Sequence, residues 1–246
     1  MSFEPWQWAL LALGAFAAGF SKTGIPGTSI LFVAVFANLM PARQATGLVL
    51  PLLIFADLFA WFVYRKHLEW GRVGRLLPWA VGGIGLGWLA LGRLNDLQTT
   101  RVVGGVIAAM LALHVWRKRR PPEEVVGRAP AWFGPFCGVM AGFATMVANA
   151  AGPVMTLYLL AMRLPKLEFL GTGAAFFLVI NWIKVPFGAQ LGLLTADSLV
   201  LNLWLAPAVA LGALAGPWAV RRIPQVAFEN AALALTAAAT IKLLFF

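Results

Sequence analysis

Two apolar segments near the start of the chain are separated by Gly19-Phe20-Ser21-Lys22-Thr23-Gly24-Ile25-Pro26-Gly27-Thr28-Ser29. Glycine and proline in this stretch stop a helix and leave backbone N–H groups without helical partners. The preceding apolar run, residues 6–20, is too short to cross a hydrocarbon core of ~30 Å at ~1.5 Å per residue. Two short helices around a polar break predict a re-entrant hairpin, and one long broken span is the alternative.

The composition is that of an integral membrane protein. Hydrophobic residues make up 61% of the chain, charged residues 11%, and the mean hydropathy is +0.83. A soluble domain carries about 25% charged residues. The 246 residues allow about eight spans of ~20 residues with short loops. The net charge of +10 lies in loops beside apolar spans, which indicates signals of membrane topology and a lipid bilayer rather than a nucleic-acid partner.

The second half of the chain repeats the first. Ala18-Gly19-Phe20 matches Ala141-Gly142-Phe143, Thr46-Gly47 matches Thr172-Gly173, and Asp57 falls opposite Asn181. At one constant spacing, Pro78, Gly83, Gly87 and Arg93 match Pro207, Gly212, Gly216 and Arg222. The sequence therefore predicts an all-α membrane protein with a first repeat over 1–120, a cytoplasmic linker over 121–130 and a second repeat over 131–246. Each repeat is a broken, re-entrant helical hairpin followed by three transmembrane helices.

The distribution of Lys and Arg favours inverted repeats. If each half crosses the membrane an odd number of times, Arg163, Lys166, Arg221 and Arg222 join the basic linker on the inside, as the positive-inside rule requires. If each half crosses an even number of times, the same four residues fall outside. The inverted arrangement places both termini outside, and duplication of this kind is a common plan for transporters.

The two breaks together predict a site for an anionic substrate. Lys22 brings a charge that is costly at membrane depth, and helix starts point N–H donors at anions. The candidate substrate-binding residues are Lys22, Thr23, Gly24, Gly27, Thr28 and Ser29 in the first break, and Asn149, Gly152 and Thr156 in the second. Lys22 supplies the charge in this interpretation, and the second break is the less charged wall. The alternatives are that Lys22 snorkels to the surface and that Asn149 only satisfies backbone groups.

Three polar residues lie inside long apolar segments. Asp57 either carries a coupling proton or forms an ion pair with Lys22 or Lys184. Asn181 occupies the equivalent position in the second half. Lys184, close to Pro186, either faces the site or snorkels. We expect no catalytic residues, no metal site and no cofactor, because H-E-x-x-H, G-x-S-x-G and clusters of His, Cys and acids are missing from the sequence.

The chain resembles the TauE/SafE family of bacterial permeases, also called sulfite exporters. The resemblance rests on G-F-S-K-T-G-I-P-G, T-M-V-A-N-A-A-G-P-V-M-T-L-Y and the turn L-P-K-L-E-F-L-G-T-G, and it spans the whole duplicated chain. It implies a non-enzymatic secondary transporter, an exporter of sulfite or organosulfonates, that works by alternating access in a bacterial inner membrane. An anion channel and a carrier for another small organic anion are the alternatives, and proton or ion coupling is open.

Overall fold

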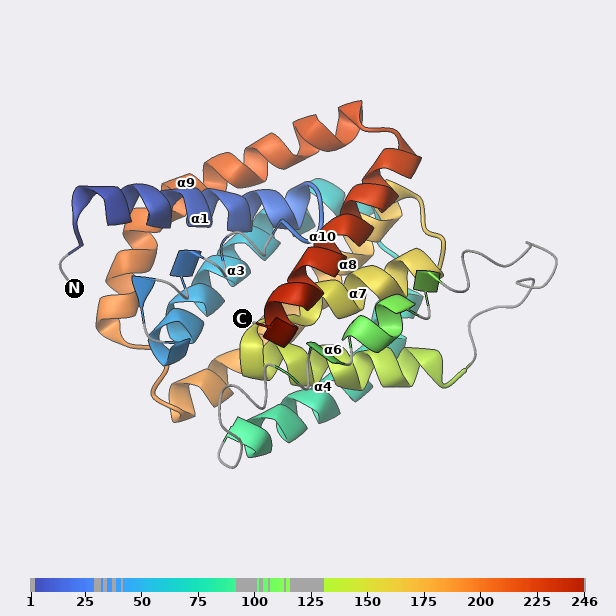
Figure 1. Cartoon of the computed structure of the whole chain (residues 1–246), viewed down its shortest axis with the longest axis horizontal. Coiled ribbons are helices and arrows are strands. Elements are labelled where there is room, and N and C mark those ends of the chain that lie inside the picture. The colour runs from blue at the N-terminus through green and yellow to red at the C-terminus, as the bar shows by residue number, and fades with distance from the viewer. Residues whose placement is uncertain are drawn as a thin grey trace.

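The computed structural model describes residues 3–28, 32, 35, 36, 39, 40, 42–91, 101, 104, 105, 107–112, 114, 115 and 131–245. The elements of this part are α1 (Pro5–Thr23), α3 (Ala42–Tyr64), the 3-10 helix η1 (Arg65–His67), α4 (Trp70–Leu91), α6 (Phe133–Ala148), α7 (Ala151–Ala161), α8 (Lys166–Gln190), α9 (Ala196–Arg222) and α10 (Gln225–Phe245) (Figure 1). The predicted linker, Ser29 and most of the helix expected after the first break lie outside the described residues.

The helices are those of a multi-pass membrane protein. Within the described chain, four segments are long and apolar enough to span a bilayer: Gly47–His67, Trp70–Ala90, Lys166–Gln190 and Ala196–Arg222. Helices α6 and α7 are shorter, with 16 and 11 residues, as expected around the second break. The all-helical membrane class is thus confirmed.

Two boundaries differ from the sequence-based expectation. Helix α1 continues through Lys22 and Thr23, so the first break begins only at Gly24. The helix gains length at its other end too, where Pro5 stands at the first helical position and Glu4 and Gln7 form a capping box. Helix α4 begins at Trp70, ahead of the apolar segment that starts at Leu76, and its first turns include two glycines and two arginines.

Two helix pairs cross at glycine contacts that leave no room for a side chain. Helix α1 lies along α9, and α6 lies along α4 (Figure 1). At four glycines of these pairs, a Cβ atom would collide with a carbonyl oxygen of the facing helix. They are Gly19 (facing Val209), Gly212 (facing Phe16), Gly83 (facing Val139) and Gly142 (facing Ala80). Close backbone approach of this kind is how small residues hold membrane helices together.

The α1–α9 and α4–α6 crossings use matched positions of the two halves. The repeat matches Gly19 with Gly142 and Gly83 with Gly212. The first helix of each half therefore packs against a helix of the other half: α1 packs on α9, and α6 packs on α4. The halves are interlocked rather than side by side.

Helices α3 and α8 pack between these pairs. A Cβ atom on Gly47, near the start of α3, would collide with the carbonyl oxygen of Leu193, just after α8. On Gly171, near the start of α8, a Cβ atom would lie 2.8 Å from the carbonyl oxygen of Tyr64, at the end of α3. Gly47 and Gly171 thus make similar close contacts, each with the far end of the other helix.

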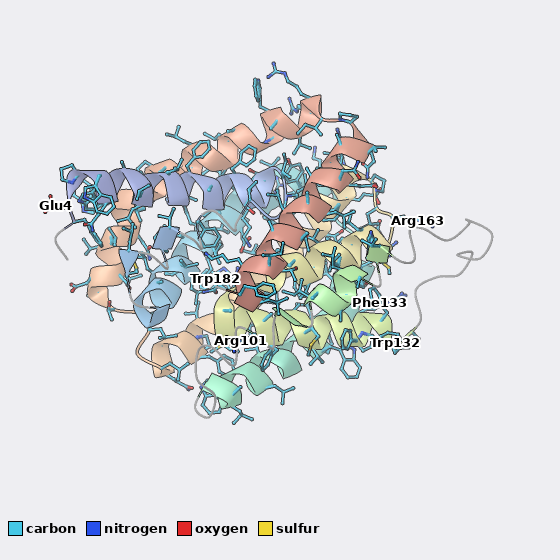
Figure 2. The ribbon with its side chains drawn as sticks, viewed as in Figure 1. Glu4, Arg101, Trp132, Phe133, Arg163 and Trp182 are labelled. Atoms are coloured by element: carbon cyan, nitrogen blue, oxygen red, sulfur yellow. The ribbon has the colours of Figure 1, made fainter. Side chains whose placement is uncertain are left out.

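The outer surface carries large apolar side chains, as a lipid-facing surface does. Leu203, Trp204 and Phe245 are each more than 70% exposed. Trp132 and Arg163 lie at one end of the longest axis and Glu4 lies at the other (Figure 2). Tryptophan near the ends of spans is typical of membrane interfaces.

Candidate functional site

A cavity of about 70 Å³ lies between the two breaks. Both halves line it. Its polar lining consists of Ser21, Lys22, Thr145, Asn149, Thr156 and Asn181, and Gly27 and Gly152 bring backbone from the two breaks. On the same measure one water needs ~10–15 Å³, so the cavity has room for a small anion but not for a bulky ligand.

Equivalent positions of the repeats line this cavity together. Thr145 stands at the position of Lys22, at the spacing that relates the two Ala-Gly-Phe segments. Phe177 stands at the position of Leu53, at the spacing that relates Asp57 to Asn181. The cavity thus has two related walls, and their chemistry differs because Lys22 of the first half has Thr145 as its counterpart in the second.

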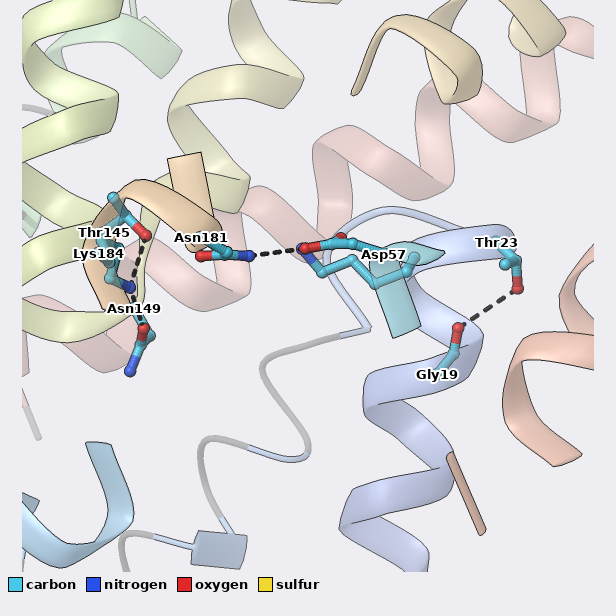
Figure 3. A network of polar contacts seen from close by, with 8 residues as sticks. Gly19, Thr23, Asp57, Thr145, Asn149, Asn181 and Lys184 are labelled. Atoms are coloured by element: carbon cyan, nitrogen blue, oxygen red, sulfur yellow. Dashed lines mark hydrogen bonds and ion pairs between the residues drawn. The ribbon is translucent and has the colours of Figure 1, made fainter. Parts of the chain in front are cut away.

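Lys22 forms a buried ion pair with Asp57. The Lys22 Nζ lies 2.8 Å from Asp57 Oδ1, and 3.9 Å from the centre of the Phe177 ring. The Lys22 side chain is only 11% exposed and Asp57 is fully buried, so Lys22 does not snorkel to the surface. Asn181 donates its Nδ2–H to Asp57 Oδ2 at 2.7 Å (Figure 3). Of the two roles left open for Asp57, the structure shows the ion pair.

Lys184 occupies a separate buried position behind the second break. Its Nζ donates to Asn149 Oδ1 at 2.5 Å and to Thr145 Oγ1 at 3.1 Å (Figure 3). The residue is 3% exposed, which excludes the snorkelling interpretation. Both acceptors line the cavity, whereas Lys184 itself stands behind them.

The second break is a short interruption centred on Asn149. Asn149 ends α6 in the left-handed conformation with φ of 50°, which asparagine tolerates better than most residues. Helix α7 then starts at Ala151, so Gly152 and Pro153, expected in the break, lie in its first turn. In this turn the N–H groups of Ala151 and Gly152 have no partner within the helix, and Pro153 has no N–H. A helix start beside a cavity favours negative charge.

Among the described residues, three of the predicted substrate-binding residues do not line the cavity. Thr23 is fully buried between α1 and α9, where its hydroxyl donates to the Ala213 carbonyl at 2.8 Å. Gly24 packs against Gly216. The Thr28 hydroxyl closes its own turn by donating to Ile25 O at 3.0 Å. Ser29, also predicted to bind substrate, lies outside the described residues.

Thr23 points away from the cavity because it still belongs to helix α1. Because α1 continues to Thr23, the side chains of Lys22 and Thr23 leave the helix in different directions. Tyr64 fixes this end of α1 by donating its hydroxyl to the Thr23 carbonyl at 2.6 Å.

Sequence reasoning missed Ser21, Thr145 and Phe177, which all line the cavity. The repeat carried the signal for Thr145, because that residue is the counterpart of Lys22. Ser21 lay inside the quoted break but beside the more conspicuous lysine. Nothing in the sequence singles out Phe177 from the other phenylalanines.

Across the described residues, no three side chains of His, Cys, Asp or Glu gather as metal ligands. The arrangement instead offers donors to an anion: an ammonium group, an amide, hydroxyls and helix-start N–H groups.

The family model for the sulfite exporter TauE/SafE matches residues 11–243. The chain belongs to the TauE/SafE sulfite exporter family. No curated protein and no solved structure gives a significant match. Membership of TauE/SafE makes the chain a transporter-family membrane protein with a small anionic substrate, and the match includes both breaks and the whole cavity. The resemblance stated from the motifs is therefore confirmed.

Proposed function

We propose that this protein is a secondary transporter that exports sulfite or organosulfonates across a bacterial inner membrane by alternating access. The observation that carries the proposal is the cavity between the two breaks, with a lysine, an asparagine and a helix start lining it. Donor groups of this kind match the oxygens of a sulfite or sulfonate group, which accept hydrogen bonds and carry negative charge.

The anion would lie between two walls. From the first half, Lys22 has N–H donors beyond the one that points at Asp57. From the second half, Asn149, the Thr156 hydroxyl and the Gly152 N–H meet the same space. A buried anion needs such partners, because an unpaired charge at membrane depth is costly.

We also propose that the two halves are inverted repeats. Helix α8 starts where α3 ends, and α3 starts beside the segment after α8, so these counterparts run in opposite directions. Lys166, at the start of α8, donates to the carbonyls of Val220 and Ile223 at 2.9 and 2.6 Å, at the end of α9. Because α8 also contacts the basic 3-10 helix η1 of the first half, basic segments from both halves lie at one end, as the positive-inside rule expects of a cytoplasmic face.

Alternating access would follow from the exchanged helix pairs. The glycine contacts join α1 to α9 and α4 to α6 through backbone, so each pair is suited to move as one body. The cavity is lined by the ends of α1 and α6, by α7 and α8, and by Leu53 of α3. Rocking of the pairs about α3 and α8 would open the cavity to one face at a time.

The test is a transport screen with purified protein in proteoliposomes. We expect saturable flux and counter-transport of the preferred anion among sulfite, sulfate, thiosulfate, sulfoacetate and taurine. Lys22→Met should weaken that anion's apparent affinity by about tenfold or more, because a charged hydrogen bond is lost and Asp57 then faces the site alone. Lys66→Met removes an exposed lysine of η1 and is the matched control.

The outcomes separate the competing functions. Single-channel currents without counter-transport would replace the carrier with a channel. Saturable transport of carboxylates but of no sulfur anion would assign the chain to another organic anion. If Lys22→Met transports as the wild type does, Lys22 is not a substrate ligand.

A further inference from the structure

The charges around the cavity do not balance. Lys22 and Asp57 neutralise one another at 2.8 Å. Lys184 donates only to neutral oxygens in the part of the chain that the structure describes, those of Thr145 and Asn149. A protonated Lys184 therefore leaves one positive charge at the site, and that charge belongs to the second half.

We propose that Lys184 is the positioning residue of the anion site: it supplies the unbalanced positive charge and turns Asn149 and Thr145 into donors. The inference rests on the proposed function, and it reverses the sequence-based expectation that Lys22 provides the charge. It also specifies the substrate class, a small anion with a single negative charge.

The hydrogen bonds fix the orientation of Asn149. A protonated lysine has only donors, so it must meet the carbonyl oxygen of the amide. Asn149 Oδ1 accepts from Lys184, and the amide nitrogen of Asn149 lies on the side away from Lys184 (Figure 3). Because Asn149 lines the cavity and its oxygen is taken by Lys184, the two N–H bonds of its amide are the part that an anion can contact.

Thr145 is polarised in the same way. Its hydroxyl oxygen accepts from Lys184 at 3.1 Å, so the hydroxyl hydrogen is left for another acceptor. Without the lysine, an amide and a hydroxyl could each present either a donor or an acceptor. With it, both side chains that separate Lys184 from the cavity present donors, which favours anions over neutral ligands.

A bound anion supplies the counter-charge that Lys184 otherwise lacks. Charges interact strongly where water is excluded, so Lys184 acts on the ligand across one layer of side chains. One negative charge neutralises the site, whereas a dianion leaves a buried excess. The site should therefore prefer a monoanion such as methanesulfonate to a dianion such as sulfate.

The experiment measures binding of methanesulfonate and of sulfate to the purified chain in lipid nanodiscs. We expect the wild type to bind methanesulfonate more tightly than sulfate. We expect Lys184→Met to weaken methanesulfonate binding by about tenfold or more, the loss typical of a charged hydrogen-bonding group. Lys166→Met is the control, since this partly buried lysine at the start of α8 also donates two hydrogen bonds, to carbonyls at the end of α9, but does not line the cavity.

A double-mutant cycle separates positioning from mere packing. Asn149→Gly keeps the left-handed backbone conformation and removes the amide. If Lys184 acts through Asn149, the two substitutions together should weaken binding by clearly less than the product of their separate effects. Independent effects would contradict the proposed route.

The results distinguish failure of this inference from failure of the proposed function. If the wild type binds no sulfur anion, the proposed function is wrong. If it binds methanesulfonate and Lys184→Met binds equally well, Lys184 has no such role. If Lys184→Met does not fold, the affinities of the wild type test the inference. Wild-type protein that binds sulfate as tightly as methanesulfonate, or more tightly, contradicts a single unbalanced charge at the site.

Discussion

Asp57 is held by two residues from different elements, Lys22 at the end of α1 and Asn181 in α8. It is fully buried, so its negative charge depends on these contacts. A buried charge that loses its partner is strongly destabilising, whereas replacing both partners of such a pair by neutral groups is often tolerated. The pair therefore has a structural effect that can be measured apart from transport.

Lys22→Met should lower the free energy of unfolding by ~3–5 kcal/mol, because it leaves the Asp57 carboxylate buried and unpaired. Adding Asp57→Asn should recover most of this loss, since an amide at position 57 can still bond Asn181. Thermal unfolding of the single and double variants in lipid nanodiscs measures the difference. A double variant no more stable than Lys22→Met would show that the ion pair is not what holds these helices.

Several residues that line the cavity could be predicted from the sequence, but the contacts of individual side chains could not. Lys22, Asn149, Gly152 and Thr156 were recognisable because polar residues and glycine interrupt apolar runs. The sequence could not show that Thr23 faces α9, since that depends on where α1 ends. Nor could it show that Lys184 meets Asn149, because that contact joins helices whose packing no local pattern encodes.

The helix pairs α1–α9 and α4–α6 depend on glycines that only their packing explains. Helix α4 has adjacent glycines with different surroundings: Gly83 faces the α6 backbone, whereas a Cβ atom on Gly82 would meet nothing within 4 Å. Several glycines in one apolar segment are typical of closely packed membrane helices, but the sequence alone does not show which of them makes the contact. Gly82 and Gly83 thus allow the effect of one added methyl group on stability to be compared at an open and at a packed position.

Gly83→Ala should destabilise the protein by ~1–3 kcal/mol, because the added methyl group collides with the carbonyl oxygen of Val139 and forces α4 and α6 apart. Gly82→Ala should be neutral or stabilise by up to ~1 kcal/mol, since alanine is the better helix former and space is open. Thermal unfolding of both variants tests the contact. Equal effects of the two substitutions would contradict the packing described for Gly83.

For the whole molecule, the repeat in the sequence anticipated the arrangement of the helices to a considerable extent. The duplication and the membrane class followed from composition and matched glycines. The exchange of first helices between halves did not, since a repeat in sequence does not reveal which copy each helix packs against. In the sequence, the inverted direction of the second half is predicted from the distribution of Lys and Arg and from the short first helices.

Cysteine labelling from the two sides of the membrane tests the direction of the second half. In a Cys137→Ala background, inverted repeats require Lys66→Cys and Arg222→Cys to react from the same face. Asp197→Cys, at the start of α9, should react from the opposite face. A membrane-impermeant maleimide on intact and on permeabilised cells measures this. Labelling of Arg222→Cys from the face opposite to Lys66→Cys would establish parallel repeats.

The hydrogen bond between Asp57 and Asn181 has a consequence for how the duplicated gene could diverge. These residues are counterparts, so in an ancestor with identical halves the position met its own copy. Two aspartates would have placed two carboxylates in contact, which cannot both be ionised at such a distance. Two asparagines can pair. A charge at this position therefore required that the two copies become different, and Lys22 in the same half gives that new charge its partner. The difference between Asp57 and Asn181 thus allows a full negative charge at a contact where two aspartates would have to share one proton.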